Sequence, residues 1–174
     1  MEKNYKSRLQ EINTFCFDVD GVFTDNIVYL GSDGEQMRTA NVRDGYAVQL
    51  AVKKGLRIII LSGGKGEAIR RRFEGLGVTE IHLGVSSKAP RFKEILAGSG
   101  LNATDVCYMG DDIPDLAVMG HAGLACCPSD AVPEIKAIAT YISPYAGGRG
   151  CVRDVLEQAL KLKGLWMDGD AMLW

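Results

Sequence analysis

Short apolar runs alternate with amphipathic segments along most of the chain. The runs that predict buried strands begin with Phe15 to Phe17 and continue over residues 56–61, 80–83, 106–109, 122–126 and 140–143. Between them, apolar positions at helical spacing predict helices over residues 44–54, 67–76, 88–97 and 152–162. This alternation, without a repeat or a linker, favours an α/β fold with a doubly wound, mostly parallel, Rossmann-like sheet.

A different pattern occupies residues 26–41, where short β-rich runs flank Gly31, Ser32, Asp33 and Gly34. An Asp-Gly pair between extended segments predicts a hairpin. Because it follows the first strand directly, a flap beside a site is favoured over a surface hairpin without a role. No insertion in the chain is long enough to form a separate cap domain.

Two carboxylates end the first strand. Asp18 and Asp20 are separated by one residue, so their side chains start on the same side of the strand. Like charges at the end of a buried run are costly unless a cation or a reaction requires them. At the carboxyl edge of a parallel sheet they suit a hard metal ion, and an acidic loop without chemistry is the alternative.

Length and charge narrow the class of protein. A chain of 174 residues fits one domain, spanning residues 1–174, with a sizeable core. A formal net charge of −2 gives no electrostatic case for binding nucleic acid or an anionic membrane. No apolar stretch approaches the roughly 20 residues of a membrane span. Residues 1–13 are polar and lack a signal-peptide core, which argues against secretion.

Cysteine usage points to a reducing compartment. The chain has five cysteines without CxxC spacing, namely Cys16, Cys107, Cys126, Cys127 and Cys151. We therefore expect reduced, buried thiols in a cytoplasmic protein rather than a zinc site or disulfides.

Four short motifs follow one another in a distinctive order. The first is Asp18-Val19-Asp20-Gly21-Val22, and the second is Ser62 at the end of the strand over residues 56–61. The third is Lys88 at a helix start, and the fourth is Gly110-Asp111-Asp112-Ile113-Pro114-Asp115. Together they resemble the haloacid dehalogenase superfamily, and each lies at a strand end or helix start, where such a motif needs to be.

The resemblance implies a magnesium-dependent phosphatase that forms an aspartyl phosphate. Asp18 is the expected nucleophile and Asp20 the expected acid/base. The expected Mg²⁺ ligands are the carboxylates of Asp18 and Asp111 and the backbone carbonyl of Asp20. Lys88 would steady Asp18 and the phosphate, although outside this motif context it would be an ordinary solvated lysine.

The remaining motif residues have supporting roles under the same resemblance. Ser62 and Gly63 are expected to bind the phosphate through a hydroxyl and free amides. Asp112 is expected to support the metal site. Asp115 either supports it too or is simply a charge at a helix start, and the two interpretations are equally good.

Further segments resemble one subfamily, the 3-deoxy-D-manno-octulosonate 8-phosphate phosphatases, over about residues 14–162. They are Asn41-Val42-Arg43-Asp44-Gly45-Tyr46, Ile60-Leu61-Ser62-Gly63, and Gly147-Gly148-Arg149-Gly150 with Arg153. The subfamily implies a cytoplasmic enzyme of lipopolysaccharide precursor synthesis. It also implies a capless homotetramer in which neighbouring subunits cover the active site. Residues 164–174, with Trp166 and Trp174, match no part of this pattern and are left unassigned.

Two arginines are candidates for binding the sugar. Arg72 falls at helical spacing among apolar positions between Ala68 and Leu76, where an arginine usually has an anion partner. The sugar acid and a structural salt bridge are equally good partners for it. Arg149, among glycines that let the segment bend, is expected to act on an active site, that of a neighbouring subunit, unless the segment is a plain loop.

Other functions stay open. A keto-deoxy-nonulosonate 9-phosphate phosphatase would share most of these motifs, but typically has glutamate where this chain has Gly64, which favours the eight-carbon sugar acid. A dehalogenase would need neither Asp20 nor Asp111. A catalytically silent binding or oligomerisation domain would be free to lose Asp18, Asp20 or Lys88, and all three are present.

Overall fold

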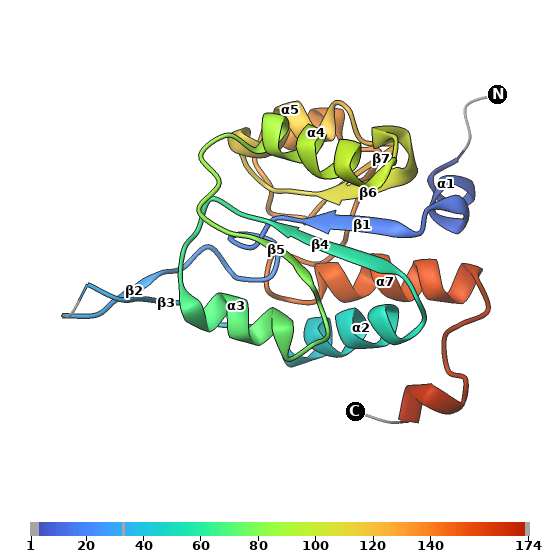
Figure 1. Ribbon diagram of the computed structural model, residues 1–174, viewed down its shortest axis with the longest axis horizontal. Helices are drawn as coiled ribbons and strands as arrows, with labels where there is room; N and C mark the ends of the chain where they lie inside the picture. Colours follow the sequence, from blue (N-terminus) through green and yellow to red (C-terminus); the bar gives the residue numbers. More distant parts are fainter. Residues whose placement is uncertain (1–3, 33, 173–174) are drawn as a thin grey trace.

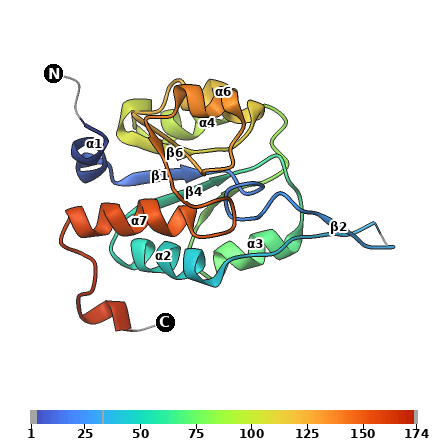
Figure 2. The ribbon, with the colours of Figure 1, turned by 180° about the vertical axis from the view of Figure 1, so that it is seen from behind.

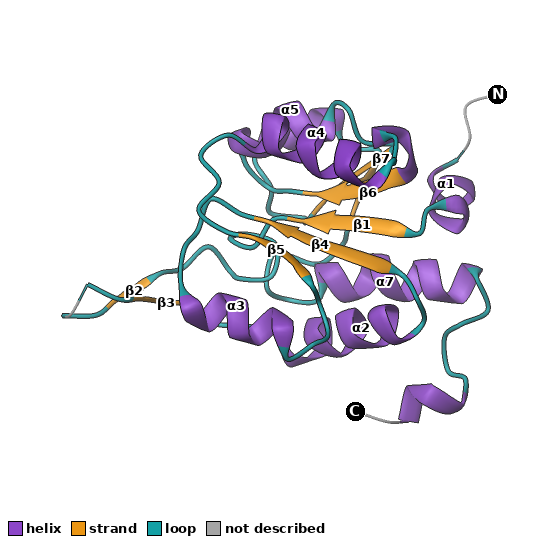
Figure 3. Cartoon of the chain, viewed as in Figure 1, coloured by secondary structure: helices purple, strands orange, loops and turns teal. Residues whose placement is uncertain are grey.

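A computed structural model describes residues 4–32 and 34–172 of the chain. Its centre is a six-stranded sheet in the order β5-β4-β1-β6-β7-β8, and every neighbouring pair of strands is parallel. Helices cover both faces of the sheet (Figures 1 and 3). The predicted α/β, doubly wound, parallel architecture is therefore confirmed.

The strands are short, as buried parallel strands often are. Those of the main sheet are β1 (Thr14–Phe17), β4 (Arg57–Leu61), β5 (Glu80–His82), β6 (Val106–Met109), β7 (Leu124–Cys127) and β8 (Tyr141–Ile142). The helices are α1 (Tyr5–Glu11), α2 (Val42–Lys53), α3 (Glu67–Glu74), α4 (Lys88–Ser99), α5 (Leu116–Met119), α6 (Pro133–Ile138) and α7 (Cys151–Leu162).

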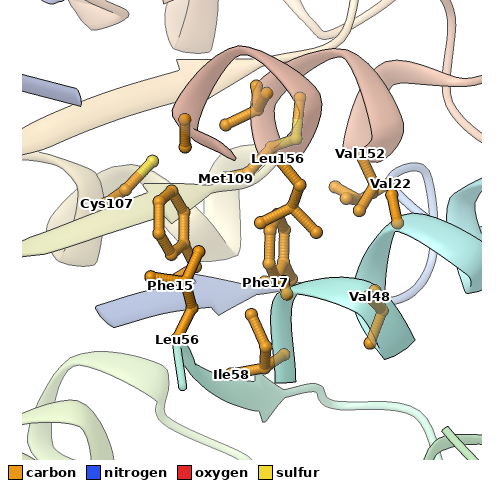
Figure 4. Packing of buried hydrophobic residues seen from close by; sticks show 14 of the residues in the cluster. Phe15, Phe17, Val22, Val48, Leu56, Ile58, Cys107, Met109, Val152 and Leu156 are labelled. Carbon is orange, nitrogen blue, oxygen red and sulfur yellow. The ribbon is translucent and has the colours of Figure 1, made fainter. Parts of the chain in front are cut away.

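The central strand β1 is buried on both faces, as its unbroken apolar pattern predicts. Phe15 and Phe17 point to one face and pack with side chains of α2 and α7, among them Val48 and Leu156 (Figure 4). Cys16 points to the other face, into a second cluster built with α4, α5 and α6. Figure 2 shows the two helical layers from behind, with α2, α3 and α7 on one side and α4 and α6 on the other.

The predicted hairpin is present between β1 and α2. It consists of β2 (Tyr29–Leu30) and β3 (Gln36–Met37), paired antiparallel, and it projects from the body of the molecule (Figure 1). The Gly31 amide donates to the Glu35 carbonyl at 2.8 Å. Asp33, part of the predicted turn, lies outside the described residues.

The C-terminal tail after Gly164, left unassigned from the sequence, packs against α2 and α7. Trp166 meets Tyr46 of α2 edge to face, with ring centroids 6.1 Å apart, and the Tyr46 hydroxyl donates to the Ala171 carbonyl at 2.6 Å. The Arg153 guanidinium lies 5.3 Å from the centre of the Trp166 ring. This tail lies at the end of the molecule away from the hairpin (Figure 1). Trp174 is outside the described residues.

Some helices differ from the sequence-based prediction. Helix α2 begins at Val42, two residues before the expected start, because the Asn41 side chain accepts from the Arg43 and Asp44 amides and caps it. Helix α3 ends at Glu74 rather than at Leu76. Helices α1, α5 and α6 were not predicted, and each is too short to show a clear helical period. Within the described ranges, no helix is both long and apolar enough to span a bilayer.

Candidate active site

The predicted functional residues meet where the central strands end. Asp18 follows β1, Ser62 follows β4, and Asp111 comes two residues after β6. Because these strands are parallel neighbours, their carboxyl ends open on one edge of the sheet. The three side chains line a hollow of about 660 Å³ together with Asp20 and Lys88.

Lys88 is held between two carboxylates. Its ammonium lies 2.7 Å from Asp18 Oδ2 and 2.7 Å from Asp115 Oδ1, and its side chain is only 6% exposed. The interpretation of Lys88 as a solvated lysine at a helix start therefore does not describe this molecule. A buried ammonium in this position places a fixed positive charge beside Asp18.

Asp115 is the most enclosed carboxylate of the cluster. Besides Lys88, its Oδ1 accepts from the Tyr108 hydroxyl at 2.6 Å, and its Oδ2 accepts from the Asp111 amide at 3.2 Å. The residue is fully buried and does not line the hollow. Its contacts orient Lys88 and the backbone that carries Asp111. Sequence reasoning missed Tyr108, which lies in an ordinary apolar strand run.

The cluster suits a small divalent cation. One carboxylate oxygen from each of Asp18, Asp111 and Asp115 lies within 4.8 Å of the others. Burial, followed by the charge of Asp115, raises the pKa of Asp18 to about 7, and burial raises the pKa of Asp111 to about 6. The three clustered carboxylates have one ammonium among them, which pairs with Asp18 and Asp115, so the cluster is short of positive charge. A Mg²⁺ ion would supply it, with Asp18 and Asp111 as the carboxylates that also face the hollow.

Asn26 contacts the same cluster. Its Nδ2 donates to Asp111 Oδ2 at 2.8 Å, and its backbone has a positive φ of 62°. Asparagine tolerates this left-handed conformation better than most residues do. The sequence shows it only as the first residue of the hairpin segment, so its contact with Asp111 could not be anticipated.

A short glycine-containing loop follows β4. Ser62 is buried, and its Oγ accepts from the Gly64 amide at 3.1 Å, which tightens the turn. Gly63 is exposed in the hollow. A hydroxyl and amides placed in this way can donate to the oxygens of an anion such as phosphate.

Asp20 has a partner that sequence reasoning missed. The Arg38 guanidinium, just after β3, donates from Nε to Asp20 Oδ1 at 2.6 Å and from Nη2 to Oδ2 at 3.1 Å. Asp20 Oδ1 also lies 3.4 Å from the Thr24 hydroxyl. In the sequence, Arg38 is one charged residue among polar hairpin neighbours, and only the fold of the hairpin brings it to the site.

The two candidate sugar-binding arginines lie outside the catalytic hollow. Arg72 is half-buried and lies against Gly45, which leaves no room for a side chain at that position. It lines a second cavity, of about 350 Å³, between the hairpin and α3. Arg149 is 68% exposed and pairs with Asp25 at 3.3 Å. Asp112 lines the catalytic hollow, and its Oδ1 accepts from the Ile113 amide.

Comparison with known protein families and curated sequences identifies similar proteins. Residues 74–155 match a family of haloacid dehalogenase-like hydrolases. The chain is 35% identical to the 3-deoxy-D-manno-octulosonate 8-phosphate phosphatase KdsC of Escherichia coli K12, over 91% of this chain and 84% of that protein. It is also 35% identical to the KdsC protein of Yersinia pestis, over 90% of this chain and 86% of the relative.

Solved structures agree with the sequence matches. The 3-deoxy-D-manno-octulosonate 8-phosphate phosphatase from Yersinia pestis superposes with a TM-score of 0.90 at 32% identity, covering 94% of this chain and 88% of the other. The phosphatase of that name from Moraxella catarrhalis has a TM-score of 0.89 at 27% identity, covering 94% of each chain. That protein was crystallised with a magnesium ion, a phosphate ion and a KDO molecule.

Proposed function

The chain belongs to the haloacid dehalogenase-like hydrolases, in the family of 3-deoxy-D-manno-octulosonate 8-phosphate phosphatases, and on this basis we propose that it hydrolyses that sugar acid phosphate. The family resemblance found in the motifs is thereby confirmed. The observation that carries the proposal is Lys88 between Asp18 and Asp115, beside Asp111 at the carboxyl edge of the sheet. This arrangement provides a nucleophile, a cation site and a positive charge within one hollow.

In the first step, an oxygen of Asp18 attacks the phosphorus of the substrate and the bond to the sugar oxygen breaks. Asp20 gives its proton to the departing sugar oxygen, so the free sugar leaves as an alcohol. The Ser62 hydroxyl and the Gly63 amide donate to the non-bridging phosphate oxygens, while the Gly64 amide holds Ser62 Oγ in place. When bound by Asp18, Asp111 and the Asp20 carbonyl, Mg²⁺ offsets the repulsion between the attacking carboxylate and the phosphate.

In the second step, water attacks the phosphorus of the aspartyl phosphate and releases inorganic phosphate. Asp20, now a carboxylate, takes the proton from that water, which restores the starting form of both aspartates. Lys88 keeps a positive charge next to Asp18 throughout, because it also pairs with Asp115, which the Tyr108 hydroxyl holds in place. We assign Asp112, which lines the hollow and accepts from the Ile113 amide, to support of the metal site.

The sugar half of the substrate needs contacts beyond the catalytic hollow. Arg72 is positioned to supply one, because it lines the cavity between the hairpin and α3. Arg149 does not line its own subunit's hollow and is 68% exposed, and we assign it to the substrate bound by a neighbouring subunit. Arg149→Ala should then raise KM for the sugar acid phosphate several-fold and leave hydrolysis of 4-nitrophenyl phosphate unchanged. Equal effects on both substrates would contradict this assignment.

We further propose a homo-oligomer, specifically the homotetramer that the family resemblance implies, in the cytoplasm. Support comes from the hairpin, whose apolar side chains are exposed; Leu30 is 79% and Tyr29 53% accessible. Exposed apolar side chains on a short hairpin favour association with another copy. The five cysteines are free and buried, which supports a reducing compartment.

The test is phosphate release from a panel of sugar phosphates, with magnesium and with a chelator. The eight-carbon sugar acid phosphate should have the highest kcat/KM, and the chelator should abolish turnover. A preference for the nine-carbon homologue would reassign the substrate. Absence of turnover on every phosphate would favour a binding or oligomerisation domain.

A further inference from the structure

The contact between Arg38 and Asp20 is more than a surface ion pair. The two hydrogen bonds, at 2.6 and 3.1 Å, join the guanidinium fork to both carboxylate oxygens. The Arg38 side chain is only 8% exposed, although the hairpin strands before it are exposed. Its Nη1 also donates to the Gln36 carbonyl at 3.2 Å, which ties the guanidinium to the hairpin.

The ion pair separates two hollows. Asp20 lines the catalytic hollow, whereas Arg38 lines the cavity of about 350 Å³ between the hairpin and α3. That cavity also contains Arg72 and has apolar walls that include Phe23 and Phe73. A phosphate ester bound at Asp18 would have to pass Asp20 to place its sugar in the second cavity.

The observed contact conflicts with proton transfer to a leaving group. A carboxyl that donates a hydrogen bond to the sugar oxygen must direct one oxygen toward it. Here both Asp20 oxygens accept hydrogen bonds from Arg38. The forked pair must loosen before Asp20 can direct an oxygen to the leaving group. Breaking a charged pair whose arginine side chain is 8% and carboxylate side chain 33% exposed is unfavourable unless another anion replaces the carboxylate.

Gly64 leaves space for such a change. A Cβ atom at this position would lie 3.2 Å from Asp20 Oδ2 and 3.6 Å from Arg38 Nη2. The space that a side chain at position 64 would fill therefore borders directly on the Arg38–Asp20 ion pair. Arg38 follows β3 directly, in the hairpin that projects from the body (Figure 1), and it already lines the cavity toward which it would turn.

We propose that Arg38 releases Asp20 and binds the carboxylate of the sugar acid instead. Binding of the sugar acid thereby leaves Asp20 available to the leaving oxygen. The inference rests on the proposed function. One carboxylate replaces another on the guanidinium, so no bond between heavy atoms changes and the charge on Arg38 stays paired. The released Asp20 carboxylate takes up a proton from solvent, and this is the proton that it gives to the leaving oxygen. A sugar phosphate without a carboxylate would bind its phosphate but leave Arg38 on Asp20.

The test compares three substrates in wild type, Arg38→Ala and Arg38→Lys, all with magnesium. The substrates are 3-deoxy-D-manno-octulosonate 8-phosphate, glucose 6-phosphate, which lacks a carboxylate, and 4-nitrophenyl phosphate, whose leaving group needs no proton. In Arg38→Ala, kcat/KM for the sugar acid phosphate should fall about tenfold or more. The kcat for glucose 6-phosphate should hold or rise, because Asp20 is no longer occupied.

Arg71→Ala is the matched control, since Arg71 is a 76% exposed arginine on α3 that pairs with Glu67. It should leave the ratio between the two sugar phosphates unchanged. Arg38→Lys, which keeps the charge and loses the fork, should lie between wild type and Arg38→Ala. Thermal unfolding of each variant separates these effects from loss of the fold.

Three results would overturn the exchange. An unchanged substrate ratio in Arg38→Ala would show that Arg38 does not contact the sugar acid. Equal loss of kcat on both sugar phosphates, with 4-nitrophenyl phosphate spared, would show that Arg38 only positions Asp20. If wild-type enzyme shows no preference for the sugar acid phosphate, the proposed function itself fails, and the inference fails with it.

Discussion

At the scale of the residue, Asp18 is distinguished by the number of groups that fix it. Its Oδ1 accepts from the Val19 amide at 2.7 Å and its Oδ2 pairs with Lys88. Asp18→Asn keeps this shape but removes the nucleophilic carboxylate. Turnover should fall below about a hundredth of wild type, while thermal unfolding changes little. Residual turnover above that level, measured by phosphate release, would contradict covalent catalysis by Asp18.

A second prediction at the scale of the residue concerns Asp115. Asp115→Asn would leave Lys88 with Asp18 as its only carboxylate partner among those observed, and would weaken the Tyr108 contact. Groups that orient the ligands of a metal typically contribute 10- to 100-fold to affinity or activity. We expect kcat to fall 10- to 100-fold in Asp115→Asn. Calorimetry on the same variant measures its magnesium affinity. Asp105→Asn, at an exposed position away from the hollow, is the control and should match wild type.

At the scale of the element, α2 and α7 are joined by a buried carboxylate. Asp44 of α2 accepts from the Arg153 amide in the first turn of α7 at 2.7 Å, while its Oδ2 is buried without a hydrogen-bond partner. The arrangement caps α7 from a neighbouring helix. Burial raises the pKa of Asp44 to about 6 from its ordinary value of 3.8.

The raised pKa of Asp44 makes the stability of the fold change with pH in a definite direction. Because the folded-state pKa is raised, the protonated form is favoured in the fold, and stability is lost as the pH rises through about 6. Asp44→Asn removes the ionisable group, so the variant does not lose this stability as the pH rises. Its side-chain oxygen can still accept from the Arg153 amide. Urea unfolding should therefore show the stability of the variant rising relative to wild type between pH 4.5 and 7.5, by up to about 2 kcal/mol. A difference that stays flat over this range would contradict the burial of a charged Asp44.

The elements also show what could be predicted from sequence. The motifs predicted that Asp18, Ser62, Lys88 and Asp111 lie close together, because the carboxyl ends of neighbouring parallel strands open on the same edge of a sheet. Arg38 could not be found in this way, since its approach to Asp20 depends on how a hairpin folds back. The apolar arc predicted around Arg72 is incomplete, because Ala68 is exposed and α3 ends before Leu76.

At the scale of the whole molecule, the hairpin and the tail lie at opposite ends (Figure 1). Leu30 of the hairpin and Met172 of the tail are similarly exposed, at 79% and 74%. If the hairpin joins the subunits, Leu30→Asp should lower the mass measured by light scattering, whereas Met172→Asp should not. An unchanged mass for Leu30→Asp, or a wild-type monomer, would contradict assembly through the hairpin.

The contact of Gly147 and Gly148 with the loop after β1 has a consequence for protein synthesis. The Gly148 amide donates to the Val22 carbonyl at 2.9 Å, and neither glycine has room for a Cβ against residues 21–25. The loop that carries Asp20 is thus supported by residues that the ribosome adds more than a hundred positions later. Strand β1 likewise gains its two neighbours only when β4 and then β6 have been made. A nascent chain should therefore remain inactive until nearly all of it has emerged from the ribosome.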